Sequence, residues 1–220
     1  MNEQKSAPVR RKKRSQLAEI WRRMRRNRLA MLGLAVVVIL ILVAVFADQI
    51  ADYDTVVIKQ DVVHRFQGPS AEHWFGTDEL GRDIFARLVH GARISLLVGV
   101  VAVAIALATG GTLGAIAGYF GGVVDNVIMR VMDVFLSIPI LLLAIMIVAA
   151  LGSSMTNLMI AIGLASMPTF ARVVRASVLS VKDQEFVEAA RAIGATNGHI
   201  ILRHILPNCL SVIIISTALQ

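Results

Sequence analysis

The sequence has 220 residues, of which 56% are hydrophobic and only 17% are charged. Soluble domains are usually about 45–50% apolar, so this composition indicates a membrane protein rather than a soluble enzyme. The net charge of +7 is concentrated beside an apolar run, and aromatic residues make up only 5%, which favours a basic cytoplasmic flank over a nucleic-acid-binding surface.

The N-terminal segment, residues 1–28, is strongly basic and carries only Glu3 and Glu19 as acidic residues. Basic flanks of this kind remain on the cytoplasmic side, so we expect a cytoplasmic N-terminus. Residues 15–28 can form an amphipathic helix that lies on the membrane surface, with membrane lipid as its partner.

The first transmembrane helix is predicted at 29–48. Leu29–Ala47 is an uninterrupted apolar run, and about 20 helical residues cross a hydrocarbon core of roughly 30 Å. A cleaved signal peptide has an apolar region of about 7–15 residues, which is shorter than this run. We therefore interpret it as a retained first span.

Residues 49–91 are polar and of mixed charge, and they are predicted to form a periplasmic segment. Gly76 and Gly81 permit tight turns. Asp83 is placed to cap a helix, IFARLVHGARISLL, that leads towards the membrane.

A metal site is the competing interpretation of the same segment. His73, Asp78, Asp83 and His90 are its candidate ligands. Their spacing matches no known ligand pattern, so we expect a structural turn and cap instead. The single cysteine, Cys209, also excludes a cysteine zinc cluster and an intrachain disulfide.

The remaining residues, 92–220, are predicted to form a transmembrane domain. The expected spans are at about 94–119, 130–151, 158–175 and 208–220. The last of these is incomplete, from which we expect a chain that is truncated at its C-terminus.

Two details are expected within these spans. Pro139 and Pro168 should kink the third and fourth spans. Arg130 and Asp133 stand three residues apart on a helix and can form an ion pair.

Small residues recur every four positions in the second span and place a stripe along one helix face. They are Ala102, Ala106, Gly110, Gly114, Gly118 and Gly122. Small residues allow helix backbones to approach closely in lipid. Packing within this chain, an interface with another subunit and a pathway-lining helix all remain open.

The segment 180–207 is polar and is predicted to protrude into the cytoplasm as a helix–turn–helix. Ser180 is its predicted N-cap. Gly194 takes the left-handed position that ends the first helix, Thr196 or Asn197 caps a second helix at roughly 197–206, and Pro207 ends it.

The first of these two helices has an apolar face and a polar face at helical spacing. The apolar face comprises Phe186, Ala189, Ala190 and Ile193. The polar face comprises Gln184, Glu188 and Arg191. Docking of another protein and a simple connector are equally compatible with this pattern.

Two motifs in this sequence resemble those of a known family. Glu188-Ala189-Ala190, then Gly194, then Leu206-Pro207 resembles the EAA signature of bacterial ABC importer permeases. The family has an apolar residue where this chain has His204. The stretch HWFGTDELGRDIF at 73–85 is similar to the hallmark of the dipeptide/oligopeptide/nickel branch, in its C-type subunit.

The resemblance implies an all-α, polytopic helical bundle of the type I, MetI-like fold, with the last one to two of six spans absent. It implies a heterodimer with a second permease subunit, ABC ATPase subunits, and a periplasmic or lipid-anchored substrate-binding protein in the bacterial inner membrane. Glu188, Ala189, Ala190 and Gly194 would couple to the ATPase. Peptides would be the transported substrate, and no cofactor is implied.

Several functions remain as alternatives. No G-x-x-x-x-G-K-[ST] sequence occurs in the chain, so ATP hydrolysis is expected on a partner and this subunit is not expected to be an enzyme. An intramembrane enzyme would require ionisable groups within the spans, where they are scarce. A nickel or glutathione importer of the same family, and a structural or assembly membrane protein, are the other candidates.

Overall fold

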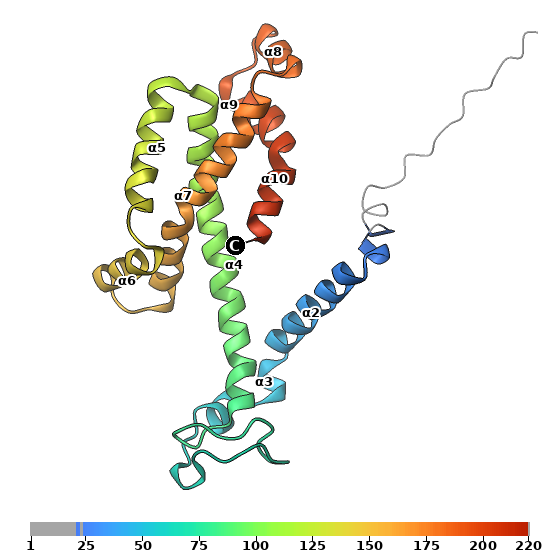
Figure 1. Ribbon diagram of the computed structural model, residues 1–220, viewed down its shortest axis with the longest axis vertical. Helices are drawn as coiled ribbons and strands as arrows, with labels where there is room; N and C mark the ends of the chain where they lie inside the picture. The colour runs from blue at the N-terminus through green and yellow to red at the C-terminus, as the bar shows by residue number, and fades with distance from the viewer. Residues whose placement is uncertain (1–20, 23, 220) are drawn as a thin grey trace, which may run out of the picture. The chain divides into compact units, whose positions relative to one another are not determined.

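Figure 1 shows the computed structural model, which describes residues 21, 22 and 24–219. Half of the surface helix predicted at 15–28, namely residues 15–20 and 23, therefore lies outside the described residues. Within them the chain is helical apart from loops and one isolated bridge between Thr77 and Asp83. The chain divides into two compact units between Arg93 and Ile94, and each is described separately.

Helix α2 (Arg28–Val45) forms the apolar part of the first unit. Its N-cap is Asn27, whose Oδ1 accepts hydrogen bonds from the backbone N–H groups of Leu29 and Ala30 at 3.0 and 3.3 Å. None of its residues is buried, as expected for a helix surrounded by lipid. The helix covers most of the first span predicted at 29–48, but it ends at Val45 and a short helix α3 (Ala47–Ile50) follows.

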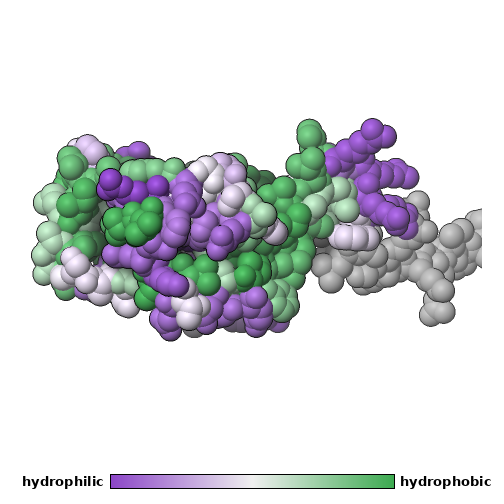
Figure 2. All heavy atoms as spheres, turned by 90° about the horizontal axis from the view of Figure 1, so that it is seen from below, coloured by the Kyte–Doolittle hydropathy of each residue, from purple (hydrophilic) through white to green (hydrophobic). Residues whose placement is uncertain are grey.

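A loop segment connects α3 to the next long helix. It contains a π-helical turn at Tyr53–Val57 and a 3-10 turn at Val62–His64. In Figure 2, which views the molecule from below, hydrophilic atoms collect over this loop segment.

Helix α4 (Ile84–Phe120) begins in the first unit and continues through the second. The Asp83 Oδ1 atom accepts a hydrogen bond from the backbone N–H of Ala86 at 2.8 Å, which confirms the predicted cap. The helix starts at Ile84, as the predicted cap requires, and continues without a break into the segment predicted as a span at about 94–119.

The other helices belong to the second unit. They are α5 (Gly122–Leu136), α6 (Ile140–Leu151), α7 (Met155–Val181), α8 (Glu185–Ala192), α9 (Asn197–Ile200), the π-helical turn Ile201–Ile205 and α10 (Leu206–Ala218). Within the described residues, four helices are long and apolar enough to cross a membrane: Arg28–Val45, Ile84–Phe120, Met155–Val181 and Asn197–Ala218. The pair α5–α6 supplies a fifth span if it counts as one.

The small-residue stripe of α4 packs against α7 of the same chain. A Cβ atom added to Gly110 would collide with the carbonyl oxygen of Met167, and one added to Gly114 with that of Ala171. A Cβ added to Gly118 would lie 2.9 Å from the Arg175 carbonyl oxygen. This part of the stripe is therefore an intramolecular packing surface.

The last member of the stripe differs. A Cβ added to Gly122 would meet nothing within 4 Å, and the residue has φ +54. Gly122 begins α5 beyond the end of α4, so the prediction that it continues the stripe is wrong.

Helices α5 and α6 are bent by 90° at the break between them. The break contains Pro139, the N-cap of α6, so the expected kink is a complete interruption. The Asp133 carboxylate does not form the predicted pair with Arg130. Asp133 accepts a hydrogen bond from Arg172 of α7 at 2.7 Å, and Asp125 pairs with Arg175 of the same helix.

Helix α7 is longer than the predicted fourth span at 158–175. It begins at Met155, where the Ser154 hydroxyl accepts from the Asn157 N–H at 3.1 Å, and it continues to Val181. Pro168 lies inside it and is buried.

Candidate docking site

Helix α8 lies in the chain between two segments that have the length and composition of membrane spans, α7 and the run Asn197–Ala218 that ends with α10. The predicted N-cap of α8, Ser180, is instead part of α7, and its hydroxyl donates to the carbonyl of Ser177 at 2.7 Å. Gln184 occupies the N-cap position, but its side chain makes no capping hydrogen bond. The correction arises because α7 continues past the local capping signal.

One side of α8 is buried against its own chain. Val187 is 0% exposed and Ala190 is 4% exposed. They belong to a hydrophobic cluster with residues from α4, α7 and α10, and Phe186 packs partly against it. The predicted apolar face was therefore wrong at Ala189 and Ile193, which are both exposed.

The end of α8 has the geometry that was predicted for Gly194. Its φ is +82, in the left-handed region that favours glycine. The Gly194 N–H donates to the carbonyl of Arg191 at 2.9 Å, and the Ala195 N–H donates to that of Ala190 at 3.1 Å. These two hydrogen bonds form a Schellman motif, which satisfies carbonyls at the helix end.

The second short helix does not end at Pro207. Thr196 is the N-cap of α9 but makes no side-chain capping bond. The chain then passes through the π-helical turn into α10, with Pro207 in its first turn. Proline lacks an N–H and its ring crowds the carbonyl four residues earlier, and a wider π turn before it leaves room for the ring.

The four predicted coupling residues occupy two different environments. Glu188, Ala189 and Gly194 are exposed, whereas Ala190 is buried. Ala190 therefore packs α8 against its own chain, while the other three residues are accessible to a partner protein.

Sequence reasoning missed the exposure of two apolar residues that flank the α9 region. Ile193 is 84% exposed and Leu202 is 69% exposed. Their signal is weak, because Ile193 also fits the apolar stripe of α8 and Leu202 lies in the π turn. Exposed apolar side chains of this kind can be covered by another protein.

His204, the residue that departs from the family signature, lies beside another histidine. It is partly buried, and its ring centroid lies 5.7 Å from that of His199. The backbone carbonyl of His204 accepts from the Asn208 side chain at 2.7 Å.

The loop segment of the first unit is organised around Asp78. Its carboxylate accepts hydrogen bonds from the backbone N–H groups of Leu80 and Arg82 at 2.9 and 3.0 Å, and from the side chains of Arg82 and Arg87. Burial raises the Asp78 pKa, but the hydrogen bonds and the charge of Arg82 outweigh it and lower the pKa to about 2.

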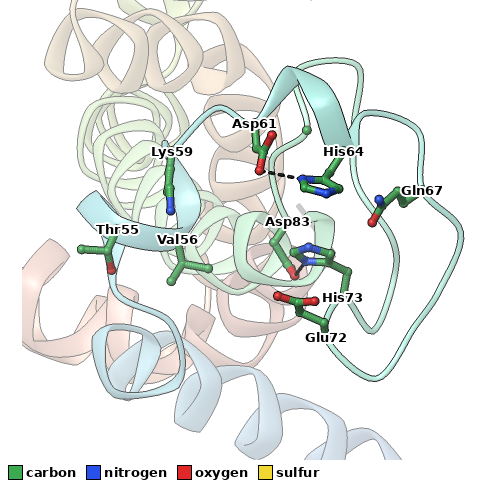
Figure 3. Close-up of a pocket in the computed structure, with 10 residues that line it drawn as sticks. Thr55, Val56, Lys59, Asp61, His64, Gln67, Glu72, His73 and Asp83 are labelled. Carbon is green, nitrogen blue, oxygen red and sulfur yellow. Dashed lines mark hydrogen bonds and ion pairs between the residues drawn. The ribbon is translucent and has the colours of Figure 1, made fainter.

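Of the other three candidate metal ligands of this segment, two pair with each other and the third contacts a backbone carbonyl. The Nδ1 of His73 lies 2.8 Å from the Oδ2 of Asp83, as Figure 3 shows. The Nε2 of His90 lies 2.7 Å from the carbonyl oxygen of Ala51. No group of three ligands suited to a metal ion occurs in residues 21, 22 and 24–219.

Gly76 and Gly81 confirm the turns that were predicted for the loop segment. Their φ angles are +75 and +74, and a Cβ at either would collide with a backbone carbonyl oxygen, of Gln67 and Asp61 respectively. A cavity of about 380 Å³ beside Gly81 is lined by Lys59, Glu72 and two histidine–aspartate pairs, His64 with Asp61 and His73 with Asp83 (Figure 3).

The sequence matches two family models. Residues 110–220 match the "Binding-protein-dependent transport system inner membrane component". Residues 15–69 match the "N-terminal TM domain of oligopeptide transport permease C". The second unit, which holds α7, α8 and α10, thus lies mostly within the first of these matches.

Two curated relatives extend the match over most of the chain. The dipeptide transport system permease protein DppC of Alkalihalophilus pseudofirmus is 48% identical over 201 residues, which is 91% of this chain and 66% of that protein. The glutathione transport system permease protein GsiD of Escherichia coli O6:K15:H31 is 49% identical over 197 residues, 90% of this chain and 65% of that protein. The chain spans slightly less than two thirds of these relatives.

The helical fold and the matches define a multi-pass, inner-membrane component of a transport system. The chain belongs to the family of binding-protein-dependent ABC importer permeases, in its oligopeptide permease C type.

Proposed function

We propose that this chain is the transmembrane permease subunit of an ATP-driven importer that carries short peptides across the bacterial inner membrane. The single observation that carries the proposal is the outer side of α8, where Glu188 and Ala189 are exposed on a helix anchored between α7 and α10. The names of the dipeptide and glutathione permeases support a peptide substrate.

The ATPase is proposed as a separate subunit that receives α8 in a groove. Glu188 would pair with a cationic side chain of that groove, and the exposed Ala189 would permit close approach. Gly194 would hold the turn that lets α9 leave the groove. A second permease subunit and a substrate-binding protein would complete the importer.

The orientation follows from charge. Arg22, Arg25, Arg26 and Arg28 flank the start of α2, and basic flanks favour the cytoplasmic side. We propose that α8 lies on this same side, where ATP is available, and that the loop segment around Asp78 faces the periplasm.

Glutathione is the second candidate substrate. Glutathione permeases from several Escherichia coli and Shigella strains are 48–49% identical to this chain, close to the 48% of the dipeptide permease. Identity at this level does not separate the two substrates. A structural or assembly role and an intramembrane enzyme are both less compatible with membership of a transport family.

The direct test is capture of the ATPase by the tagged chain, followed by peptide uptake in vesicles. Glu188→Lys should reduce both, because a cation replaces the carboxylate on the exposed face. Glu79→Lys is the matched control, since it reverses the same charge at an exposed site in the loop segment. Unchanged capture and uptake with Glu188→Lys would contradict the docking site.

A further inference from the structure

The end of α4 is joined to α8 and α9 through one side chain, Tyr119. Its hydroxyl donates a hydrogen bond to the Oδ1 of Asn197 at 2.8 Å. The guanidinium carbon of Arg191 lies 5.4 Å from the centroid of its ring, within the range of a cation–π interaction. The residue is only 8% exposed.

These two contacts come from opposite sides of the Gly194 turn. Arg191 is in the last turn of α8, and Asn197 is the first residue of α9. Tyr119 therefore contacts both short helices at once. A shift of either helix relative to α4 has to lengthen or break one of the two contacts.

The apolar part of Tyr119 reinforces this link. It belongs to the same hydrophobic cluster as Val187 and Ala190, the two buried residues of α8. The outer side of α8 is available to a partner, and the inner side lies in a cluster with Tyr119. Displacement applied to the outer side is transferred inwards because close-packed side chains transmit strain.

The small-residue stripe of α4 connects this displacement to α7. Gly114 lies directly against the backbone of Ala171, and Gly118 lies against the Arg175 carbonyl and the buried Val178 side chain. Contacts of this kind are stiff, since backbone and a buried β-branched side chain have little freedom to rotate away.

We propose that Tyr119 is a positioning residue that transmits movement of the α8–α9 turn into α4 during transport. This inference rests on the proposed function of α8 as the ATPase-docking helix. An ordinary hydrogen bond corresponds to a bias of about two- to tenfold between two conformations, so its loss should weaken the transmission by a similar factor.

The test compares Tyr119→Phe with Tyr53→Phe, since the sequence has two tyrosines. Both variants lose one hydroxyl, but Tyr53 lies in the loop segment and is 47% exposed. The chain is reconstituted with its ATPase and second permease in vesicles. Captured ATPase, ATP hydrolysis and peptide imported per ATP hydrolysed are measured for each variant.

Tyr119→Phe should capture the ATPase normally and import about two- to tenfold less peptide per ATP, whereas Tyr53→Phe should match the unmodified chain. Asn197→Ala should give the same loss, and the double variant should be no worse than either single one, because both remove the same bond.

Three outcomes would overturn the inference. An unchanged import-to-ATP ratio in Tyr119→Phe would show that the hydroxyl transmits nothing. A loss that is fully explained by reduced ATPase capture would show a merely structural role. Failure of the unmodified chain to capture any ATPase would overturn the proposed function, and the inference with it.

Discussion

The packing of α4 on α7 predicts that Gly114→Ala destabilises the protein while Gly111→Ala does not. The added methyl at position 114 would lie 3.0 Å from both the carbonyl carbon and the Cα of Ala171, and closer still to the carbonyl oxygen. At position 111 it would lie 3.5 Å from a Leu107 methyl and 4.0 Å from a Val174 methyl, which are ordinary contacts.

The comparison isolates the packing contribution to the free energy of unfolding. Both variants gain the same helix propensity, about 1 kcal/mol for alanine over glycine, so this contribution cancels in the difference. Overpacking costs about 1–3 kcal/mol. The upper part of that range applies at Gly114 because its neighbour is backbone, which cannot adopt another rotamer. We expect Gly114→Ala to be about 2 kcal/mol less stable than Gly111→Ala.

The assay is thermal unfolding of both purified variants in the same detergent. A difference of about 2 kcal/mol corresponds to a lowering of Tm by roughly 4–8 °C in a protein of this size. Equal midpoints for the two variants would refute the close backbone contact between α4 and α7. A lower midpoint for Gly111→Ala would reverse the assignment of the packed face.

Two further predictions concern the turn after α8 and the loop segment. Gly194→Ala should lower the free energy of unfolding by about 1 kcal/mol, because alanine is strained at φ +82 although space is open around it. Gly198→Ala, which also meets nothing within 4 Å and lies inside α9, should not lower the stability in the same thermal assay because alanine is favoured in a helix, and equal losses in both variants would argue against the left-handed turn. The Asp78 carboxylate, with its pKa lowered to about 2, should stabilise the loop segment fully above about pH 4 and lose this contribution as the pH falls towards 2. Hydrogen exchange of the Leu80 and Arg82 amides as a function of pH measures this, and an Asp78→Asn variant that kept the same pH dependence would show that another group is responsible.

Features set by local backbone chemistry could be predicted from the sequence. Gly194 was placed correctly because a left-handed helix end strongly favours glycine. Asp83 was placed correctly as a cap because a short acceptor side chain precedes a helical run. The apolar spans follow from length and composition alone.

Features set by distant parts of the chain could not be predicted. Asp133 has Arg130 nearby in sequence, yet it pairs with Arg172 because α5 lies along α7. The buried side of α8 was misassigned because eight residues form little more than two turns. So few positions do not show from sequence alone that Val187 is the residue that is buried. Ser180 carries a capping signal that is overruled by the continuation of α7.

The glycine contacts between α4 and α7 also fix the relative direction of these two helices. Gly110 meets Met167, Gly114 meets Ala171 and Gly118 meets Arg175, so sequence numbers rise together along the two helices and the helices run parallel. The chain between them, which contains the 90° bend between α5 and α6, must therefore return from the end of α4 to the start of α7. The end of α4 consequently lies beside the end of α7, from which the chain continues to the Gly194 turn.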